Sequence, residues 1–416
     1  MLQFNFQKIS QVPRGFFKSI REINNYLEKL REILKTKNYD SPESFLIFPE
    51  EKFKFQKIEP NFKLIILIGI GGASRGTQAI YTALKNKKKL KEILFLDTLN
   101  PILLRQIISK VKLINPKKEK VAICFISKSG LTIESIINFF TFWQAIKKYL
   151  PKIFIITEEN SPLWNFGQKK NWQLLSVSKQ IEDRFSILGK TAIFPLYLSG
   201  VNIKELSLGA KIANEKCLVN DLFKNFALAS ALTIFYHWKK RKNNYVNFVF
   251  PPELDFFGKW YSQLMAESLG KNNKGITPMT AIGTNDLHSL VQLYFDGPQD
   301  KLFNFIFIEN LGLDFSVSKL EDFTKIFPEI KNKKIWQLTK AIFEGVKKVY
   351  LKKKIPFTET ILSELNEKNL GFLFEMKMIE IILLAKLMKV YPFDQPAVKL
   401  YKKETQKLLK ISFQKN

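Results

Sequence analysis

The strongest constraint on the fold is a regular alternation of short apolar runs and longer helical patterns, which begins near residue 63. The apolar runs are rich in Ile, Leu, Val and Phe and predict buried parallel strands at Leu64–Ile68, Ile93–Asp97, Val121–Ile126 and Ile153–Thr157. The intervening segments have helical patterns and cover residues 76–86, 101–113 and 132–149. This alternation predicts an α/β sandwich whose ligands bind at the carboxyl ends of the strands.

A second set of elements follows, and we place the boundary between the two α/β units near residue 200. Its predicted elements are a helical stretch at Leu206–Lys240, a strand at Tyr245–Phe250, a helix at Asp255–Leu269 and a strand at Phe303–Ile308. Residues 335–411 are expected to be mostly helical, and residues 270–276 and 297–301 are expected to be loops. The chain shows no repeat with a period of about 20 to 50 residues, which disfavours a solenoid.

The net charge of +28, from 66 basic and 38 acidic residues in a chain of 416, would normally indicate nucleic acid or an anionic membrane as partner. Here, however, 59 of the basic residues are Lys and only seven are Arg. The chain is also rich in Ile, Phe and Asn, and an AT-rich genome favours this composition. A nucleic-acid-binding protein is therefore a weak alternative, which steeply salt-dependent binding would support. In this background the rare Arg and His residues are the informative ones.

The composition also bears on location. The longest uncharged apolar run, Leu64–Ser74, is far shorter than the ~20 residues of a membrane span. Two cysteines, Cys124 and Cys217, cannot form a disulfide framework, which favours a reducing compartment. The N-terminus lacks the apolar core of a signal peptide, and its mixture of Arg and Glu favours a surface helix over a transit peptide. We expect a cytoplasmic protein that does not cross a membrane.

Two polar turns follow predicted strands of the first unit. Gly69–Gly76 (GIGGASRG) is a glycine-rich turn of the kind that lets backbone amides approach an anion. Its alternatives are a plain tight turn and a dinucleotide fingerprint, and the latter is disfavoured because Ser74 stands where a glycine is required. Ser127–Thr132 (SKSGLT) combines hydroxyls and an ammonium that suit a phosphate monoester, although Thr132 in a capping box is an equally good explanation of this turn alone. Together the turns favour a phosphorylated small molecule as ligand.

Three further segments contain acid–base side chains. On the helix predicted at Asp255–Leu269, Gln263 and Glu267 share a face, and Glu267 is a candidate general base, although a surface glutamate is the simpler interpretation. The segment TNDLHS contains His288, one of two histidines, whereas His237 lies in an apolar helix and is expected to be a packed or surface residue. The segment FDQPAVKLYKK, beginning at Phe393, opens the last helix with Pro396 at an early position.

These segments, together with EDRFSILG at Glu182–Gly189, occur in an order that resembles the glucose-6-phosphate isomerases, and most closely their compact bacterial branch. The resemblance covers most of the chain from about residue 45. It implies two sugar-isomerase (SIS-type) α/β/α sandwich domains with mainly parallel sheets, plus N-terminal and C-terminal helices. The corresponding ranges are an N-terminal helical segment at 1–44, the two domains at 45–200 and 201–392, and a C-terminal helix at 393–416.

The resemblance also implies a role for individual residues. Glu267 matches the base that moves a proton between the first two sugar carbons, and Arg184 matches the cation that stabilises the enediolate. His288 and Lys402 match the pair linked to ring opening, with the histidine supplied by the neighbouring subunit of a homodimer. The substrate-binding positions are Gly72, Ser127, Lys128, Ser129, Thr132 and Gln263. The family uses no metal or other cofactor, and its chemistry needs only a carboxylate and a fixed positive charge. The implied partners are a sugar phosphate and a second copy of the chain, with no specific nucleic acid and no membrane.

The sequence also departs from the family pattern. Glu182 and Asp183 stand where two glycines usually precede the arginine, and Ala73 stands where a serine is usual. The two acids are expected either to repel an anionic substrate or to pair with Arg184, and Ser74 is a candidate replacement for the missing hydroxyl. These departures motivate an alternative to an active isomerase, namely a catalytically weak or inactive phosphosugar-binding regulator of the same fold.

Overall fold

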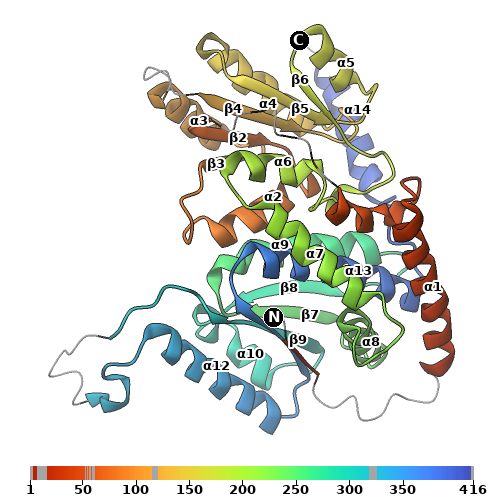
Figure 1. Cartoon of the computed structure of the whole chain (residues 1–416), viewed down its shortest axis with the longest axis vertical. Coiled ribbons are helices and arrows are strands. Elements are labelled where there is room, and N and C mark those ends of the chain that lie inside the picture. The colour runs from red at the N-terminus through yellow and green to blue at the C-terminus, as the bar shows by residue number, and fades with distance from the viewer. Residues whose placement is uncertain are drawn as a thin grey trace.

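A computed structural model describes residues 3–6, 16–51, 53, 55, 58, 61–114, 120–317 and 326–413. Within them the chain folds around two five-stranded sheets, which lie one above the other in Figure 1. The first sheet has the strand order β3-β2-β4-β5-β6, and all of its neighbouring strands are parallel. The second has the order β1-β10-β9-β7-β8 and is parallel except for the edge strand β1.

The first sheet contains the four strands expected from the apolar runs. They are β2 (Leu64–Ile68), β3 (Glu92–Leu96), β4 (Val121–Ile126) and β5 (Lys152–Thr157), and the sequence did not predict the edge strand β6 (Gln173–Ser176). Helices α2 (Gly72–Leu84), α3 (Pro101–Ile114), α4 (Ile133–Ile146) and α5 (Pro162–Lys169) connect them. All side chains of β2 are buried, and alternate residues enter different core clusters, so this sheet is covered on both faces.

The second sheet contains strands that the sequence interpretation missed. Its strands are β7 (Asn244–Val249), β8 (Thr277–Ile282), β9 (Lys301–Asn310), β10 (Phe357–Glu364) and β1 (Gln3–Phe6). Residues 335–411 are mostly helical, as expected, but the sequence interpretation missed β10, which lies between α12 (Ile335–Lys352) and α13 (Glu367–Met388). The helical stretch at Leu206–Lys240 is two helices, α7 (Ile203–Cys217) and α8 (Phe226–Lys239), and Asn225 caps the second. Helices α9 (Asp255–Leu269) and α10 (Val291–Asp296) complete this part of the fold.

Helix α13 lies between the two sheets and packs against α7, α8 and α9 (Figure 1). It is apolar around most of its circumference, as expected of a helix buried on all sides. It meets α7 backbone to backbone: a Cβ on Gly209 would lie 1.8 Å from the carbonyl oxygen of Lys368, and one on Gly371 would lie 1.9 Å from that of Leu206. One core cluster includes side chains from both sheets, so the two α/β units share a core, and the domain boundaries given above remain predictions.

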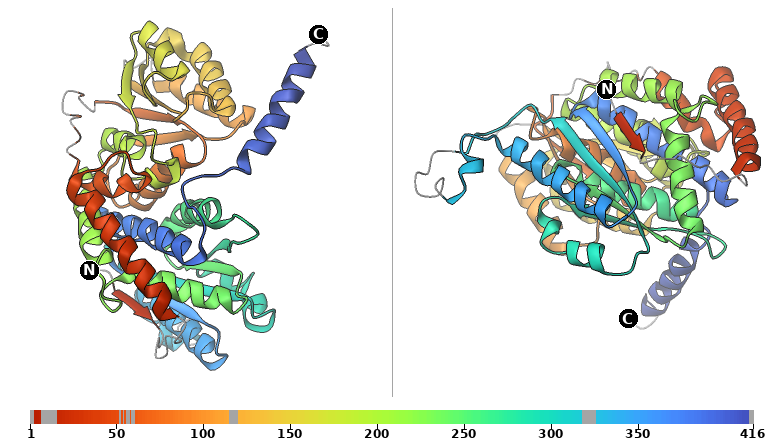
Figure 2. Two further views of the ribbon diagram at one scale, coloured as in Figure 1. Left: turned by 90° about the vertical axis from the view of Figure 1, so that its right-hand side faces the viewer. Right: turned by 90° about the horizontal axis from the view of Figure 1, so that it is seen from below.

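The terminal helices lie outside this core. Helix α1 (Phe16–Thr36) packs along the molecule with Ile23, Leu27 and Leu30 buried, so it is a covering helix with one apolar face. Helix α14 (Val398–Phe413) projects from the body in Figure 2, and residues 399–408 of this helix are exposed. No helix in the described parts of the chain is long and apolar enough to cross a membrane.

Candidate active site between the two sheets

The centre of the site is Arg184, on a single-turn helix η4 (Asp183–Phe185) that follows the first sheet. Its side chain is 1% exposed, and each N–H of the guanidinium has an acceptor. Nε donates to Ser268 Oγ at 3.1 Å. Nη1 donates to Glu267 Oε2 at 3.2 Å and to Gln395 Oε1 at 2.7 Å. Nη2 donates to the carbonyl oxygens of Pro392 at 2.6 Å and Asp394 at 3.3 Å. The guanidinium is therefore fixed in orientation by two separate parts of the chain, the last turn of α9 and residues 392–395.

Glu267 reaches this arginine from the last turn of α9. The helix buries Trp260, Tyr261 and Leu264 on one side, which leaves Gln263 and Glu267 together on another. Glu267 Oε1 accepts a hydrogen bond from Gln263 Nε2 at 3.0 Å, and the glutamate side chain remains 29% exposed. The carboxylate is thus oriented by an amide on one oxygen and a cation on the other, while a ligand can still approach it.

The glycine-rich turn after β2 packs directly against this pair. Gly71 has a φ of 63°, and a Cβ there would lie 3.2 Å from Gln263 Nε2. A Cβ on Gly72 would lie 2.6 Å from the Asp183 Cβ and 2.7 Å from the Arg184 nitrogen, so no side chain fits at this point. Ser74 is buried and its hydroxyl donates to the Gly71 carbonyl at 3.3 Å, so in this structure it does not replace the hydroxyl that Ala73 lacks.

The hydroxyl-rich turn after β4 forms the other side of the site. Ser127 Oγ donates to Thr132 Oγ1 at 3.1 Å, and Ser129 Oγ accepts from the Leu131 amide at 3.3 Å. Thr132 occupies the N-cap position of α4, but its side chain makes no capping hydrogen bond. The capping box considered as an alternative explanation of this turn is therefore absent. The hydroxyls lie in the turn that leads into the N-terminus of α4, and a helix N-terminus is a favourable position for an anion.

Glu182, which stands where the family usually has a glycine, lies within the site. Its Oε1 is 3.4 Å from Lys128 Nζ in the hydroxyl-rich turn, and its Oε2 is 3.6 Å from Arg184 Nη1. Gln395 Nε2 donates to the same Oε2 at 2.9 Å. Contacts of 3.4 Å or more make these ion pairs weak, but they connect the hydroxyl-rich turn, through Glu182 and Arg184, to Glu267.

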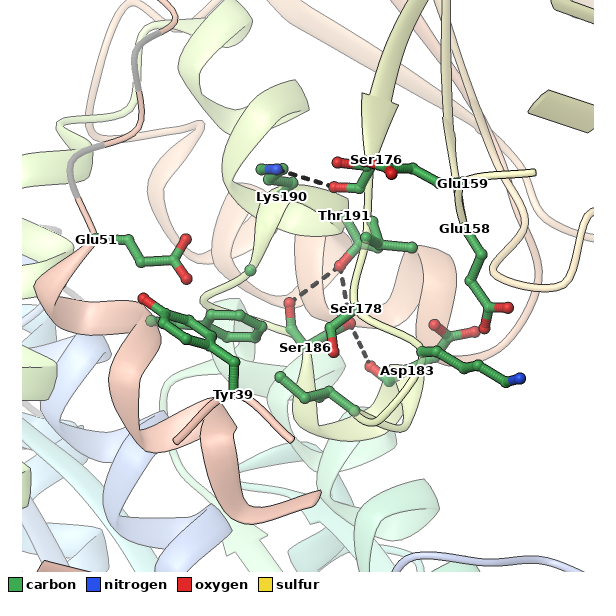
Figure 3. Close-up of a pocket in the computed structure, with 15 residues that line it drawn as sticks. Tyr39, Glu51, Glu158, Glu159, Ser176, Ser178, Asp183, Ser186, Lys190 and Thr191 are labelled. Atoms are coloured by element: carbon green, nitrogen blue, oxygen red, sulfur yellow. Dashed lines mark hydrogen bonds between the residues drawn. The ribbon is translucent and has the colours of Figure 1, made fainter. Parts of the chain in front are cut away.

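Asp183 faces a different cavity, of about 440 Å³, shown in Figure 3. Tyr39, Glu158, Ser178 and Lys190 also line this cavity, which lies next to the carboxyl ends of β5 and β6. Desolvation by burial, reinforced by Glu182, raises the pKa of Asp183 to about 6, although Lys128 opposes the shift. The expectation that one acid pairs with Arg184 therefore applies to Glu182, while Asp183 lines the neighbouring cavity.

The structure adds residues that sequence reasoning missed. Gln395 joins Arg184 to Glu182 through the two ends of its amide. Ser268 holds Arg184 Nε, and Trp260 Nε1 donates to the Arg184 carbonyl at 3.2 Å. Lys271 forms an ion pair with Asp394 at 2.7 Å, which fixes the segment before α14. Gln395 and Asp394 belong to the FDQP segment already singled out, and Ser268 and Lys271 belong to the segment QLMAESLGK around Glu267, but nothing in the sequence indicated which contacts these side chains make.

Two predicted site residues are not in contact with Glu267. His288 is exposed and follows the carboxyl end of β8, whereas Glu267 lies in the last turn of α9. Helix α9 packs against β8 with Gly258 beside Thr280, and its last turn lies farther toward the start of the strand. His288 and Glu267 of one chain are thus separated along the sheet. Lys402 is exposed on α14, next to Tyr401, whose pKa is raised by burial and then by Glu134 and Glu267.

The fold and this geometry define a class: a two-sheet α/β protein whose candidate acid–base site lies where the sheets meet. Comparison with known proteins gives the family. Residues 53–311 match the model of the phosphoglucose isomerase family. The probable glucose-6-phosphate isomerase of Methanococcus maripaludis is 31% identical over 395 residues, which cover 92% of this chain and 88% of that protein. The glucose-6-phosphate isomerase of Methanocaldococcus jannaschii is 31% identical over 372 residues, with 88% of each chain covered.

Solved structures show the same fold. A hypothetical protein from Thermus thermophilus superposes with a TM-score of 0.85 and 26% identity, covering 98% of this chain and all of that one. A glucose-6-phosphate isomerase from Chlamydia trachomatis has the same fold, with a TM-score of 0.72 at 19% identity over 98% of this chain and 77% of that one. The chain belongs to the phosphoglucose isomerase family.

Proposed function

We propose that this chain reversibly converts glucose 6-phosphate to fructose 6-phosphate through a cis-enediol intermediate, as an enzyme of sugar-phosphate metabolism in the cytoplasm. The observation that supports it best is the series of contacts from Lys128 through Glu182 and Arg184 to Glu267. It joins a candidate phosphate-binding turn and a candidate base in one continuous site. Family membership supports the reaction, and these contacts support our proposal that it takes place at this site.

In this proposal the hydroxyl-rich turn holds the phosphate. Its donors are the ammonium of Lys128 and the hydroxyls of Ser127, Ser129 and Thr132, and the first amides of α4 add further donors. Gly72 lines the site because its backbone is free of a side chain, and Gln263 orients Glu267. Anchoring the phosphate brings the carbonyl end of the open-chain sugar toward Glu267.

Glu267 then acts as the general base. One carboxylate oxygen accepts the proton from C2 of the aldose, and the same carboxyl returns a proton to C1. Negative charge develops on the enediolate oxygens during this transfer. Arg184 is a fixed, permanent cation beside Glu267 and stabilises that charge without having to reorient.

The direct test is conversion of glucose 6-phosphate by the purified protein in D₂O. We expect fructose 6-phosphate that carries solvent deuterium at C1, because a proton held on Glu267 exchanges with water. Binding of glucose 6-phosphate with no turnover would refute the enzyme and support the regulator alternative. Turnover with no deuterium incorporated would contradict Glu267 as a shuttle that exchanges with solvent.

We further propose a homodimer in which His288 completes the site of the partner subunit, with Lys402 on α14 closing the same site. The separation of His288 from Glu267 within one chain supports this arrangement. Mixing inactive Glu267→Gln and His288→Ala proteins after subunit exchange should restore about one quarter of wild-type activity, since half of the dimers are mixed and each has one intact site. No recovery, from variants shown to exchange subunits, would contradict a shared site.

A further inference from the structure

The carboxylate of Glu182 is the feature of this site that the reaction itself does not require. It precedes η4, with 21% of its side chain exposed, and faces Lys128, Arg184 and Gln395. Isomerisation needs a base and a fixed cation, which Glu267 and Arg184 already supply. A second carboxylate beside an anion-binding turn must therefore have another effect.

Arg184 does not depend on Glu182 for its position. Each guanidinium N–H donates to another acceptor, and Glu182 approaches Nη1 only as a charge, at 3.6 Å. Lys128 differs, because Glu182 is the one ion-pair partner of its ammonium among the described residues. The main effect of Glu182 thus falls on the lysine of the hydroxyl-rich turn.

Three carboxylates lie near the two cations of this part of the site before any ligand is bound. Glu182 and Glu267 pair with Lys128 and Arg184, and Asp183, whose pKa of about 6 leaves it ionised at neutral pH, adds a further negative charge that interacts with both cations. A phosphate group arriving at Lys128 therefore has to compete with a carboxylate that is already there. Because both side chains are only partly exposed, water screens this competition less than at a free surface.

We propose that Glu182 occupies Lys128 in the free protein and sets the affinity of the site for phosphate. A phosphorylated ligand displaces the carboxylate from the lysine, while Gln395 continues to hold Glu182 Oε2. The cost of that displacement weakens the binding of every anion, inorganic phosphate included. A sugar phosphate still binds because its sugar adds contacts, whereas free phosphate has no such contacts and occupies the site weakly. This inference rests on the proposed phosphate-binding role of the turn.

The test is calorimetric titration of the full-length protein with inorganic phosphate at neutral pH and low ionic strength. Glu182→Gln keeps an acceptor for Gln395 but removes the charge, and we expect it to bind phosphate about tenfold more tightly than wild type. Glu182→Asp keeps the charge and should bind within about twofold of wild type. Glu159→Gln, which removes an exposed carboxylate near the same sheet edge, is the matched control and should bind as wild type does.

The variant Lys128→Met separates two claims: that the hydroxyl-rich turn binds phosphate, and that Glu182 weakens this binding. If Glu182→Gln binds phosphate no more tightly than wild type while Lys128→Met weakens binding, the role of Glu182 is overturned and the phosphate-binding turn stands. If Lys128→Met leaves phosphate binding unchanged in both backgrounds, the turn itself is wrong, and this inference falls with it. If Glu182→Gln raises the affinity for phosphate, and this increase disappears when Lys128→Met is added, the inference is supported.

Discussion

Arg184 donates to Glu267 across 3.2 Å and so joins a turn that follows the first sheet to the last turn of a helix that packs on the second. These residues are 83 positions apart in the chain. The site therefore exists only when both α/β units are folded and packed together. The predictions below test this relationship and the residues that maintain it.

Replacing Glu267 with Gln removes the base but keeps the size of the side chain and an oxygen for Arg184. We expect turnover to fall by about 10²- to 10⁴-fold, with binding of glucose 6-phosphate largely retained. Steady-state kinetics with a coupled assay, together with calorimetric binding, separates the two effects. The control Glu159→Gln should leave turnover unchanged. A Glu267→Gln protein as active as wild type would contradict the proposed base.

Replacing Arg184 with Lys keeps the charge but loses the planar fork that contacts two separate parts of the chain. We expect kcat to fall on the order of 10²- to 10³-fold, because a shorter ammonium cannot hold the same position beside Glu267. The melting temperature should also fall, since several buried acceptors lose their donor. Arg105→Lys on the surface of α3 is the control for the chemistry of the substitution. Equal kinetics for the two variants would argue against a specific role for Arg184.

Replacing Gly72 with Ala should displace the arginine turn. The added Cβ would lie 2.6 Å from the Asp183 Cβ and 2.7 Å from the Arg184 nitrogen, which is too close without movement of the backbone. Because small misplacements are costly in catalysis, we expect kcat to fall on the order of 10²-fold. Gly345→Ala in α12 is the matched control, because no atom lies within 4 Å of its added Cβ. That control should be active and more stable by about 0.5–1 kcal/mol.

Asp183 should make stability depend on pH. Desolvation raises its pKa from 3.8 to about 6 in the folded protein, so the folded state binds more protons than the unfolded state between these values. The contribution of Asp183 to stability is therefore fully present below about pH 4 and lost as pH rises toward and above about 6. Asp183→Asn should remove this dependence. The free energy of unfolding of the variant minus that of wild type should therefore be about 2 kcal/mol larger at pH 8 than at pH 4.

Urea denaturation of both proteins across this pH range measures the difference. Asp40→Asn, at an exposed aspartate near the start of η1 (Pro42–Glu50), controls for the loss of a carboxylate elsewhere. A constant difference between Asp183→Asn and wild type at all pH values would show that the carboxyl is not desolvated.

The sequence predicted the elements that are fully buried and missed those whose pattern depends on tertiary contacts. Strands β2 and β4 were predicted directly from continuous apolar runs, because both of their faces are covered. Strand β8 contains Pro278, which is tolerated because β8 is an edge strand. Strand β10 buries Thr358 and Thr360, which donate to Asn304 on the neighbouring strand, so its polar residues hide it from a search for apolar runs.

In the site, too, the sequence predicted some features, while others depend on tertiary contacts. The order of the motifs led to Glu267 and Arg184 and to the turn that contains Lys128, and the scarcity of Arg in the chain drew further attention to Arg184. The direction of the Glu182 and Asp183 side chains was not predictable, because it depends on Lys128, Gln395 and the packing of Gly72 against η4. The separation of His288 from Glu267 likewise follows from the packing of α9 on β8, which a linear pattern does not contain.

The contact between α7 and α13 has a consequence for how this molecule can move. Where Gly209 and Gly371 bring the two backbones together, neither helix has a side chain that could change rotamer and let the other slide. Sliding of α7 against α13 would have to break that seam outright, so the main chain sets the spacing of these two helices. We expect ligand entry and release to depend instead on outlying segments such as α14, where substitutions at exposed positions other than Lys402 should alter release rates while leaving the chemical step untouched.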